Sequence, residues 1–292
     1  MNTKVITIAN IKDGVGKTAS TAAIGDILAR MMNKKVLVID TTNHNDLSRK
    51  FGYDPYFHVE PTLDNLLLKW LNTKEDIREG FTSPIPYIHE GIINKPYPLK
   101  NIIYENLSII CSSSELNNVF LKMDYSDDSI VRTLLSQLRN LNKFDYILVD
   151  TAPSYAYSNI RDHFIKNSDY LLIPSSATKE AINGANCLID SFIRTNEHSK
   201  IHAVNNLNLL GLFFCNVSIE DIAQFNHHAM SGDFFDNIPL LNTVIPKVTN
   251  TVNHGNLEAP ITALTPNSSA SWGYISLVRE ILSRIADIEP KI

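Results

Sequence analysis

The sequence predicts an α/β fold: a single doubly wound, mostly parallel β-sheet with helices on both faces. Three observations lead to this prediction. Apolar, β-rich runs recur along the 292 residues with helix-patterned segments between them, and hydrophobic residues make up 44% of the chain. The runs are continuous rather than alternating, which is typical of strands buried on both faces of a parallel sheet. The expected strands are residues 4–9, 35–40, 107–111, 144–150, 170–174, 209–216 and 243–246.

Length and composition narrow the class of protein. We expect residues 1–292 to form one large α/β domain. The net charge of −5 is not typical of a nucleic-acid binder. The three cysteines, Cys111, Cys187 and Cys215, form no C-x-x-C pair, which disfavours iron–sulfur or zinc sites and favours a reducing cytosol. Neither a signal peptide nor an apolar run of the ~18 residues that a membrane span needs is visible, so we expect a cytoplasmic protein.

The first expected strand is followed by a glycine loop and then by a helix pattern over residues 19–32. Residues 12–18 read K-D-G-V-G-K-T. Glycines let the backbone turn sharply, so that several N–H groups reach one anion, and the helix N-terminus adds a partial positive charge. Lys17 is expected to hold the β- and γ-phosphates, and the Thr18 hydroxyl to bind Mg²⁺. The sequence therefore predicts a P-loop nucleotide-binding domain.

The loop departs from the general P-loop pattern, because Ile11 stands where that pattern has glycine and Lys12 adds a second lysine. With Lys12 and Lys17, it resembles the deviant Walker A loop, K-G-G-x-G-K-[ST], of the ParA/MinD family of ATPases. The resemblance implies that ATP is the nucleotide and that Lys12 and Lys17 are catalytic residues. It also implies that Lys12 reaches the nucleotide of a partner subunit. The loop residues expected to contact ATP are Lys12, Asp13, Gly14, Val15, Gly16, Lys17, Thr18 and Ala19.

Asp13 stands where the family usually has glycine. A carboxylate facing the triphosphate at ~6 Å would cost about 3 kcal/mol per unit charge at an effective dielectric constant of ~20. We therefore expect the Asp13 side chain to point outward.

A second motif follows the second expected strand, where residues 40–48 read D-T-T-N-H-N-D-L-S. It resembles the family's D-x-D-P-Q segment, which implies that Asp40 is a catalytic residue that helps to hold the Mg²⁺ shell through water. Thr42 replaces the second aspartate, which orients the attacking water in relatives, and a threonine cannot accept a proton at neutral pH. We therefore expect slow hydrolysis, with His44 and Asp46 either substituting for that aspartate or serving as polar loop residues.

The third motif is an apolar run that ends in an aspartate, residues 144–150, followed by T-A-P-S. It resembles the family's Walker B strand. A buried strand would deliver Asp150 to the sheet edge, where its carboxylate holds the Mg²⁺ water shell. Residues 151–154 would then form a switch loop that senses the γ-phosphate.

Two later segments are candidates for the base-binding side of the site. Asn216 ends an expected strand where relatives often place an asparagine on the adenine edge, although a simple turn asparagine fits equally. Pro246 belongs to an I-P-K segment that resembles the family's I-P-R/K loop, whose backbone lies near the base.

The region from about 72 to 106 is proline-rich and shows no clear period, so we expect an irregular excursion from the sheet. It carries either a hairpin or partner surface, or an insertion with only a packing role.

The missing C-x-x-C, the lack of a C-terminal tyrosine cluster and the absence of a basic amphipathic tail favour the ParA branch of the family. This resemblance implies an ATP-dependent homodimer that binds DNA without sequence preference. A ParB-type centromere-binding partner would release it by stimulating hydrolysis, and the protein would segregate plasmid or chromosomal DNA. It would be nucleoid-associated while ATP is bound and would not bind a membrane.

Other interpretations stay open. Residues 191–292 hold six basic and nine acidic side chains, a local net charge of −3, whereas DNA binding needs clustered cations. Lys200, Lys247 and Arg279 of two subunits form either a basic stripe or an ordinary solvated surface. One alternative function is a catalytically weakened, nucleotide-dependent scaffold or regulator, which Thr42 suggests. Another is a MinD-like positioning ATPase.

Overall fold

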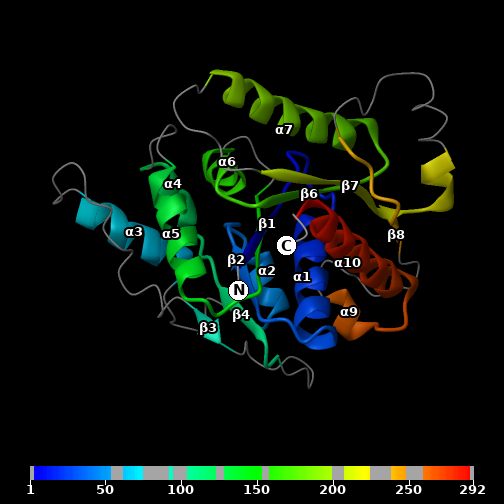
Figure 1. Cartoon of the computed structure of the whole chain (residues 1–292), viewed down its shortest axis with the longest axis horizontal. Coiled ribbons are helices and arrows are strands. Elements are labelled where there is room, and N and C mark those ends of the chain that lie inside the picture. The colour runs from blue at the N-terminus through cyan, green and yellow to red at the C-terminus, as the bar shows by residue number, and fades with distance from the viewer. Residues whose placement is uncertain are drawn as a thin grey trace.

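A computed structural model describes residues 3–53, 62–74, 92–94, 104–122, 128–152, 158–198, 207–223, 238–247 and 259–289. Its strands are β1 (Lys4–Ile8), β2 (Val36–Asp40), β3 (Ile93–Asn94), β4 (Leu107–Ile110), β5 (Tyr146–Asp150), β6 (Tyr170–Ser175), β7 (Asn208–Val217) and β8 (Ile245–Pro246). They form one sheet in the order β3-β4-β2-β5-β1-β6-β7-β8 (Figure 1). All neighbouring strands pair in parallel except β3, which is antiparallel to β4.

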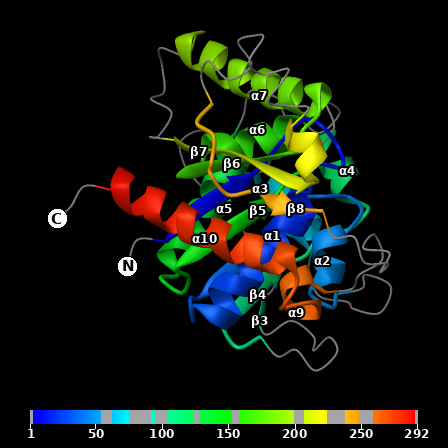
Figure 2. The same ribbon diagram turned by 90° about the vertical axis from the view of Figure 1, so that its right-hand side faces the viewer.

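Helices cover both faces of this sheet. They are α1 (Lys17–Asp26) with its π-helical continuation η1 (Ile27–Met31), α2 (Asp46–Lys50), α3 (Leu63–Lys74), α4 (Leu116–Phe120), α5 (Ser129–Asn140), α6 (Ser158–Lys166), α7 (Lys179–His198), α9 (Ile261–Leu264) and α10 (Ser269–Ile288). In the central strand β1, Ile6 and Ile8 pack in one hydrophobic core with α1 and α10. Val5 points to the other face and packs in a second core with α5 and α6. Figure 2 shows α10 crossing α1, with α7 on the far side of the sheet.

The expected α/β fold is confirmed, and element boundaries shift by a few residues. The helix expected at 19–32 begins at Lys17. Most of the excursion expected at 72–106 lies outside the described residues. Within the part that is described, β3 pairs with β4. No described helix combines the length and hydropathy that a membrane span requires.

A buried carboxylate joins α1 to elements far away in the sequence. Asp26 is fully buried and accepts hydrogen bonds from Arg30 Nε at 2.8 Å and Nη2 at 2.7 Å, from the Tyr104 hydroxyl at 2.9 Å and from Thr262 Oγ1 at 2.6 Å. Burial and the neighbouring Asp26 raise the pKa of Tyr104 well above its usual value. Both Asp26 oxygens are thus satisfied, which is the condition under which a buried charge is tolerated.

Because the strands are parallel, the loops that follow them lie at one edge of the sheet. The loops after β1, β2 and β5 carry the three sequence motifs, and Asn216 lies at the end of β7, so the fold brings them to a common edge.

Candidate functional site

The loop between β1 and α1 is a sharp turn that only glycine allows at two positions. Gly14 has φ +73° and Gly16 has φ +89°, both in the left-handed region. A Cβ on Gly16 would lie 2.7 Å from Cys215 Sγ at the end of β7. A Cβ on Gly14 would have no atom within 4 Å, so this position opens onto free space.

Lys17 is the first residue of α1 and is buried in the floor of the site. Its Nζ donates a hydrogen bond to the Lys12 carbonyl at 2.8 Å. Burial lowers the Lys17 pKa to about 8, and the negative charges of Asp150 and Asp13 partly oppose this shift. A bound anion would replace lost water as the partner of this ammonium group.

The start of the loop is fastened by a residue that the motif analysis missed. Asn10, fully buried, donates to the Pro174 carbonyl at 2.9 Å and to the Ala181 carbonyl at 3.3 Å, and its Oδ1 accepts from the Lys12 N–H at 2.9 Å. A Cβ on Gly184 of α7 would lie 2.8 Å from Asn10 Oδ1, so the helix packs directly on the loop. The Lys12 backbone is therefore fixed on both sides, while its side chain is exposed.

Asp13 is exposed, as expected, but its carboxylate is not turned away from the loop. Asp13 Oδ1 accepts a hydrogen bond from the Gly14 N–H at 2.7 Å. Its charge also acts on Lys17, whose pKa it raises.

Asp150, at the end of β5, is buried beside the P-loop. Thr21 Oγ1 donates to its Oδ1 at 3.3 Å, and the nearby Thr18 side chain lowers the pKa of the carboxyl group. Its Oδ2 is buried without a hydrogen-bond partner. Burial, together with the nearby charge of Asp40, raises the Asp150 pKa to about 7. An unpartnered carboxylate oxygen next to a threonine hydroxyl is a set of hard oxygen donors, which fits a Mg²⁺ ion and its waters.

Asp40, at the end of β2, is fully occupied by its own chain. Oδ1 accepts from the Thr42 N–H at 2.9 Å and from its hydroxyl at 2.7 Å. Oδ2 accepts from the Ser48 N–H at 2.9 Å and from its hydroxyl at 2.7 Å. Burial raises the Asp40 pKa, and these four bonds oppose that rise. The described contacts make Asp40 the anchor of the β2–α2 loop, and its expected part in the Mg²⁺ shell stays a prediction.

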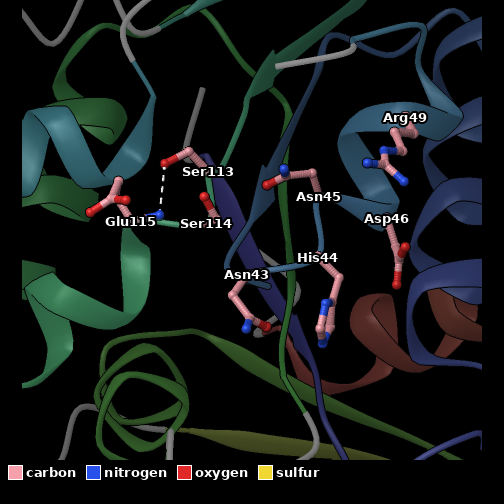
Figure 3. Close-up of a pocket in the computed structure, with 8 residues that line it drawn as sticks. All are labelled: Asn43, His44, Asn45, Asp46, Arg49, Ser113, Ser114 and Glu115. Carbon is pink, nitrogen blue, oxygen red and sulfur yellow. Dashed lines mark hydrogen bonds between the residues drawn. The ribbon is translucent and has the colours of Figure 1, made fainter. Parts of the chain in front are cut away.

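A polar cavity of about 610 Å³ lies outside that loop, between the ends of β2 and β4 (Figure 3). His44 and Asp46, the two alternatives to the missing aspartate, lie on its wall next to each other, and Glu115 lies on the opposite wall. Thr42 itself is buried, and Ser112 Oγ donates to its carbonyl at 2.5 Å. His44 and Asp46 therefore belong to the cavity between the ends of β2 and β4.

The residues expected on the base side also reach this edge of the sheet. Asn216 is exposed and has φ +58°, directly after the Cys215 that contacts Gly16. Strand β8 pairs with β7, and its Pro246 lies opposite Val217, the residue after Asn216. The fold thus brings Asn216 and Pro246 close to the loop, and their contact with adenine stays a prediction.

Arg161 is a further residue that sequence reasoning missed. It is 2% exposed, pairs with Asp162 at 2.9 Å and has an Nη1 without a hydrogen-bond partner. Its charge lowers the pKa of Lys17, so it adds a second buried cation near the phosphate loop. No motif marks it, because its position depends on the packing of α6.

In the expected switch loop, the Thr151 hydroxyl donates to the Ile8 carbonyl at 2.8 Å, and residues 153–154 lie outside the described part of the chain.

Comparison with known proteins adds independent findings. Residues 3–205 match the family AAA_31, described as an AAA domain. The chain is 26% identical to a ParA family protein of Chlamydia pneumoniae over 98% of this chain and 100% of the relative. It is 23% identical to the sporulation initiation inhibitor protein Soj of Bacillus subtilis, over 95% and 98% of the two chains. The septum site-determining protein MinD of Pyrococcus horikoshii, in complex with Mg-ADP, has a similar fold: the TM-score is 0.65 at 20% identity, over 99% and 100% of the chains.

Proposed function

This chain belongs to the AAA_31 family of AAA domains, its relatives include ParA-family and Soj proteins, and we propose that it is a ParA-type partition ATPase. ATP binding would join two chains into a dimer that binds DNA without sequence preference. A ParB-type partner would stimulate hydrolysis and release the dimer, and this cycle would segregate plasmid or chromosomal DNA.

The observation that carries this proposal is the arrangement of two lysines on one loop. Lys17 is buried and its Nζ lies within the loop, whereas the Lys12 side chain is exposed on a backbone that is fixed by Asn10 and α7. Lys17 is thus suited to the nucleotide of its own subunit. Lys12 is suited to a charge that comes from outside, in the manner of an arginine finger supplied in trans.

Mg²⁺ would be held by the Thr18 hydroxyl and, through water, by the unpartnered Oδ2 of Asp150. When bound, it would neutralise charge on the β- and γ-phosphates. Lys17 and the loop N–H groups would orient the phosphates. Asp40 would keep the β2–α2 loop in place through Thr42 and Ser48.

The DNA-binding part of the proposal draws its support from the family resemblance and from two cations. Lys247 and Arg279 are exposed in the described part of the chain, and Lys200 lies outside it. Arg284 does not belong to such a surface, because its guanidinium donates to the carbonyls of Leu210 and Leu240.

Replacing Lys12 with alanine is expected to prevent ATP-dependent dimerisation. Sedimentation should show a wild-type dimer with Mg²⁺ and ATP and a monomer with ADP, whereas Lys12→Ala should stay monomeric with both. Removing the trans cation leaves like-charged triphosphates facing each other without compensation. Affinity for ATP in the monomer should change by less than about tenfold, since Lys17 remains.

A matched control is Lys34→Ala, which removes an exposed lysine before β2, at the opposite edge of the sheet. It should dimerise like the wild type. An oligomeric state that does not respond to ATP would contradict the proposed dimer switch.

A second candidate function is a nucleotide-dependent scaffold that recruits partners without useful turnover. The observation that favours it is Thr42, whose hydroxyl proton is already donated to Asp40 at 2.7 Å and which cannot act as a base. Such a scaffold would hold ATP for long periods in its dimeric state.

Phosphate release with Mg²⁺, ATP and double-stranded DNA distinguishes the two functions. Repeated turnover by the wild type supports the ATPase, and retention of uncleaved ATP supports the scaffold. If Thr42 limits hydrolysis, Thr42→Asp should raise the rate about tenfold or more, and Thr42→Ser, which keeps the hydroxyl, should not. A rate for Thr42→Asp that is equal to or lower than wild type would exclude Thr42 as the limiting position.

A further inference from the structure

One carboxylate occupies the phosphate loop from within. Asp13 Oδ1 accepts the Gly14 N–H at 2.7 Å, which is the distance of a strong charge-assisted hydrogen bond. Backbone N–H groups of such a loop are the donors that bind an anion. Asp13 therefore uses, in the same loop, a donor that a phosphate oxygen would need.

The loop lysine is also engaged by its own chain. Lys17 Nζ donates to the Lys12 carbonyl at 2.8 Å, and the Asp13 charge acts on the same ammonium group. The space next to Gly14 is open, since a Cβ there would meet no atom within 4 Å. The loop is thus open at Gly14, and it already contains the negative charge of Asp13.

An incoming nucleotide must displace the carboxylate from Gly14 and then tolerate its charge nearby. The repulsion scales with the charge of the ligand. Free ATP carries about four negative charges at neutral pH, and its Mg²⁺ complex carries about two, so the penalty falls more heavily on the metal-free form. A glycine at this position would impose no such difference.

We propose that Asp13 is a specificity-determining residue that makes this loop discriminate against metal-free nucleotide in favour of its Mg²⁺ complex. The inference rests on the proposed nucleotide binding and adds a selection step to it. The carboxylate occupies the Gly14 N–H, and a ligand whose charge is partly neutralised displaces it at lower cost.

Two substitutions separate the charge of Asp13 from its hydrogen bond. Asp13→Asn keeps an oxygen that accepts from Gly14 but removes the charge, whereas Asp13→Gly removes both. Equilibrium binding of ATP is measured by calorimetry with Mg²⁺ and with EDTA, at low and high salt. The control Glu105→Gln changes net charge equally at an exposed site before β4, at the opposite edge of the sheet.

Asp13→Asn is expected to tighten binding of metal-free ATP about tenfold and binding of Mg·ATP about threefold or less. The preference for Mg·ATP should thus narrow, and the change should shrink at high salt because charges near the surface are screened. Asp13→Gly should tighten both forms further, since Gly14 N–H becomes available. Glu105→Gln should change neither.

Equal effects of Asp13→Asn on both forms of ATP, or no effect, would overturn the role of Asp13 while leaving nucleotide binding intact. If neither the wild type nor the variants bind ATP in any form, the proposed function itself is wrong, and this inference with it. Thermal melts in the absence of nucleotide verify that each variant is folded.

Discussion

Gly16→Ala is expected to abolish ATP binding and to destabilise the protein by about 3 kcal/mol. The new Cβ would lie 2.7 Å from Cys215 Sγ, and the residue would keep φ near +89°. The left-handed conformation costs an alanine about 1–2 kcal/mol, and overpacking adds about 1–3 kcal/mol. Relief of the clash moves the loop away from β7 and displaces its N–H groups from the phosphate position. Urea denaturation and ATP calorimetry measure the two effects.

Two further variants separate the causes. Gly14→Ala has the same backbone requirement, at φ +73°, but no atom within 4 Å, so it should cost only about 1 kcal/mol. Combining Gly16→Ala with Cys215→Ala removes the sulfur atom and should recover about 1–2 kcal/mol relative to the sum of the single variants. Equal costs at Gly14 and Gly16 would show that the contact with Cys215 is not the cause.

Asp150→Asn is expected to abolish the Mg²⁺-dependent gain in stability on ATP binding while stabilising the nucleotide-free protein. At ATP concentrations 100 times the dissociation constant, wild type should gain about 2.7 kcal/mol. The variant should lose the part of this gain that depends on Mg²⁺, because Asn supplies no charge to the metal shell. In the absence of ligand, the substitution removes a buried carboxylate whose Oδ2 has no partner. The free energy of unfolding of the variant should therefore rise by about 1 kcal/mol at pH 8.

The stabilisation depends on pH with a defined sign. The Asp150 pKa is raised from 3.8 to about 7 in the folded state, chiefly by burial. The folded protein therefore binds this proton more tightly than the unfolded chain, and its stability falls as pH rises from about 4 to 7. The asparagine variant lacks this dependence, so its advantage should be absent near pH 4 and complete above pH 7. Thermal melts of both proteins across this range measure it.

Asp26→Asn is the matched control, since Asp26 is equally buried but fully bonded. Loss of its charge leaves Arg30 without a carboxylate, and it should destabilise the protein by about 3 kcal/mol without changing the Mg²⁺ response. Destabilisation by both substitutions would indicate that Asp150 is a structural residue like Asp26.

The fold and the glycine loop after β1 were predictable because their signals are local. Strand runs, the glycine loop and the aspartate that ends β5 lie in short stretches, and parallel pairing brings strand ends to one edge. The resemblance to the ParA/MinD family rests on the same short stretches and is confirmed.

The contacts that shape the site were not predictable, because they join residues distant in sequence. Gly16 lies against Cys215, Asn10 donates to Ala181 in the first turn of α7, and Arg161 reaches the surroundings of Lys17 only through the packing of α6. Asp40 illustrates a second limit. Its motif suggested a metal-shell residue, whereas its bonds to Ser48 depend on how the following loop folds back.

The fastening of the loop after β2 has a consequence for chimeric proteins. The Asp40 carboxylate accepts hydrogen bonds from both sides of the bend at Asn45, from Thr42 before it and from Ser48 after it. Two of its four bonds come from main-chain amides and would survive any exchange of side chains other than proline. The loop after β2 could therefore be replaced by the corresponding loop of another ATPase. The exchanged loop should fold in the same place if its length is kept and a hydroxyl residue is retained at position 48.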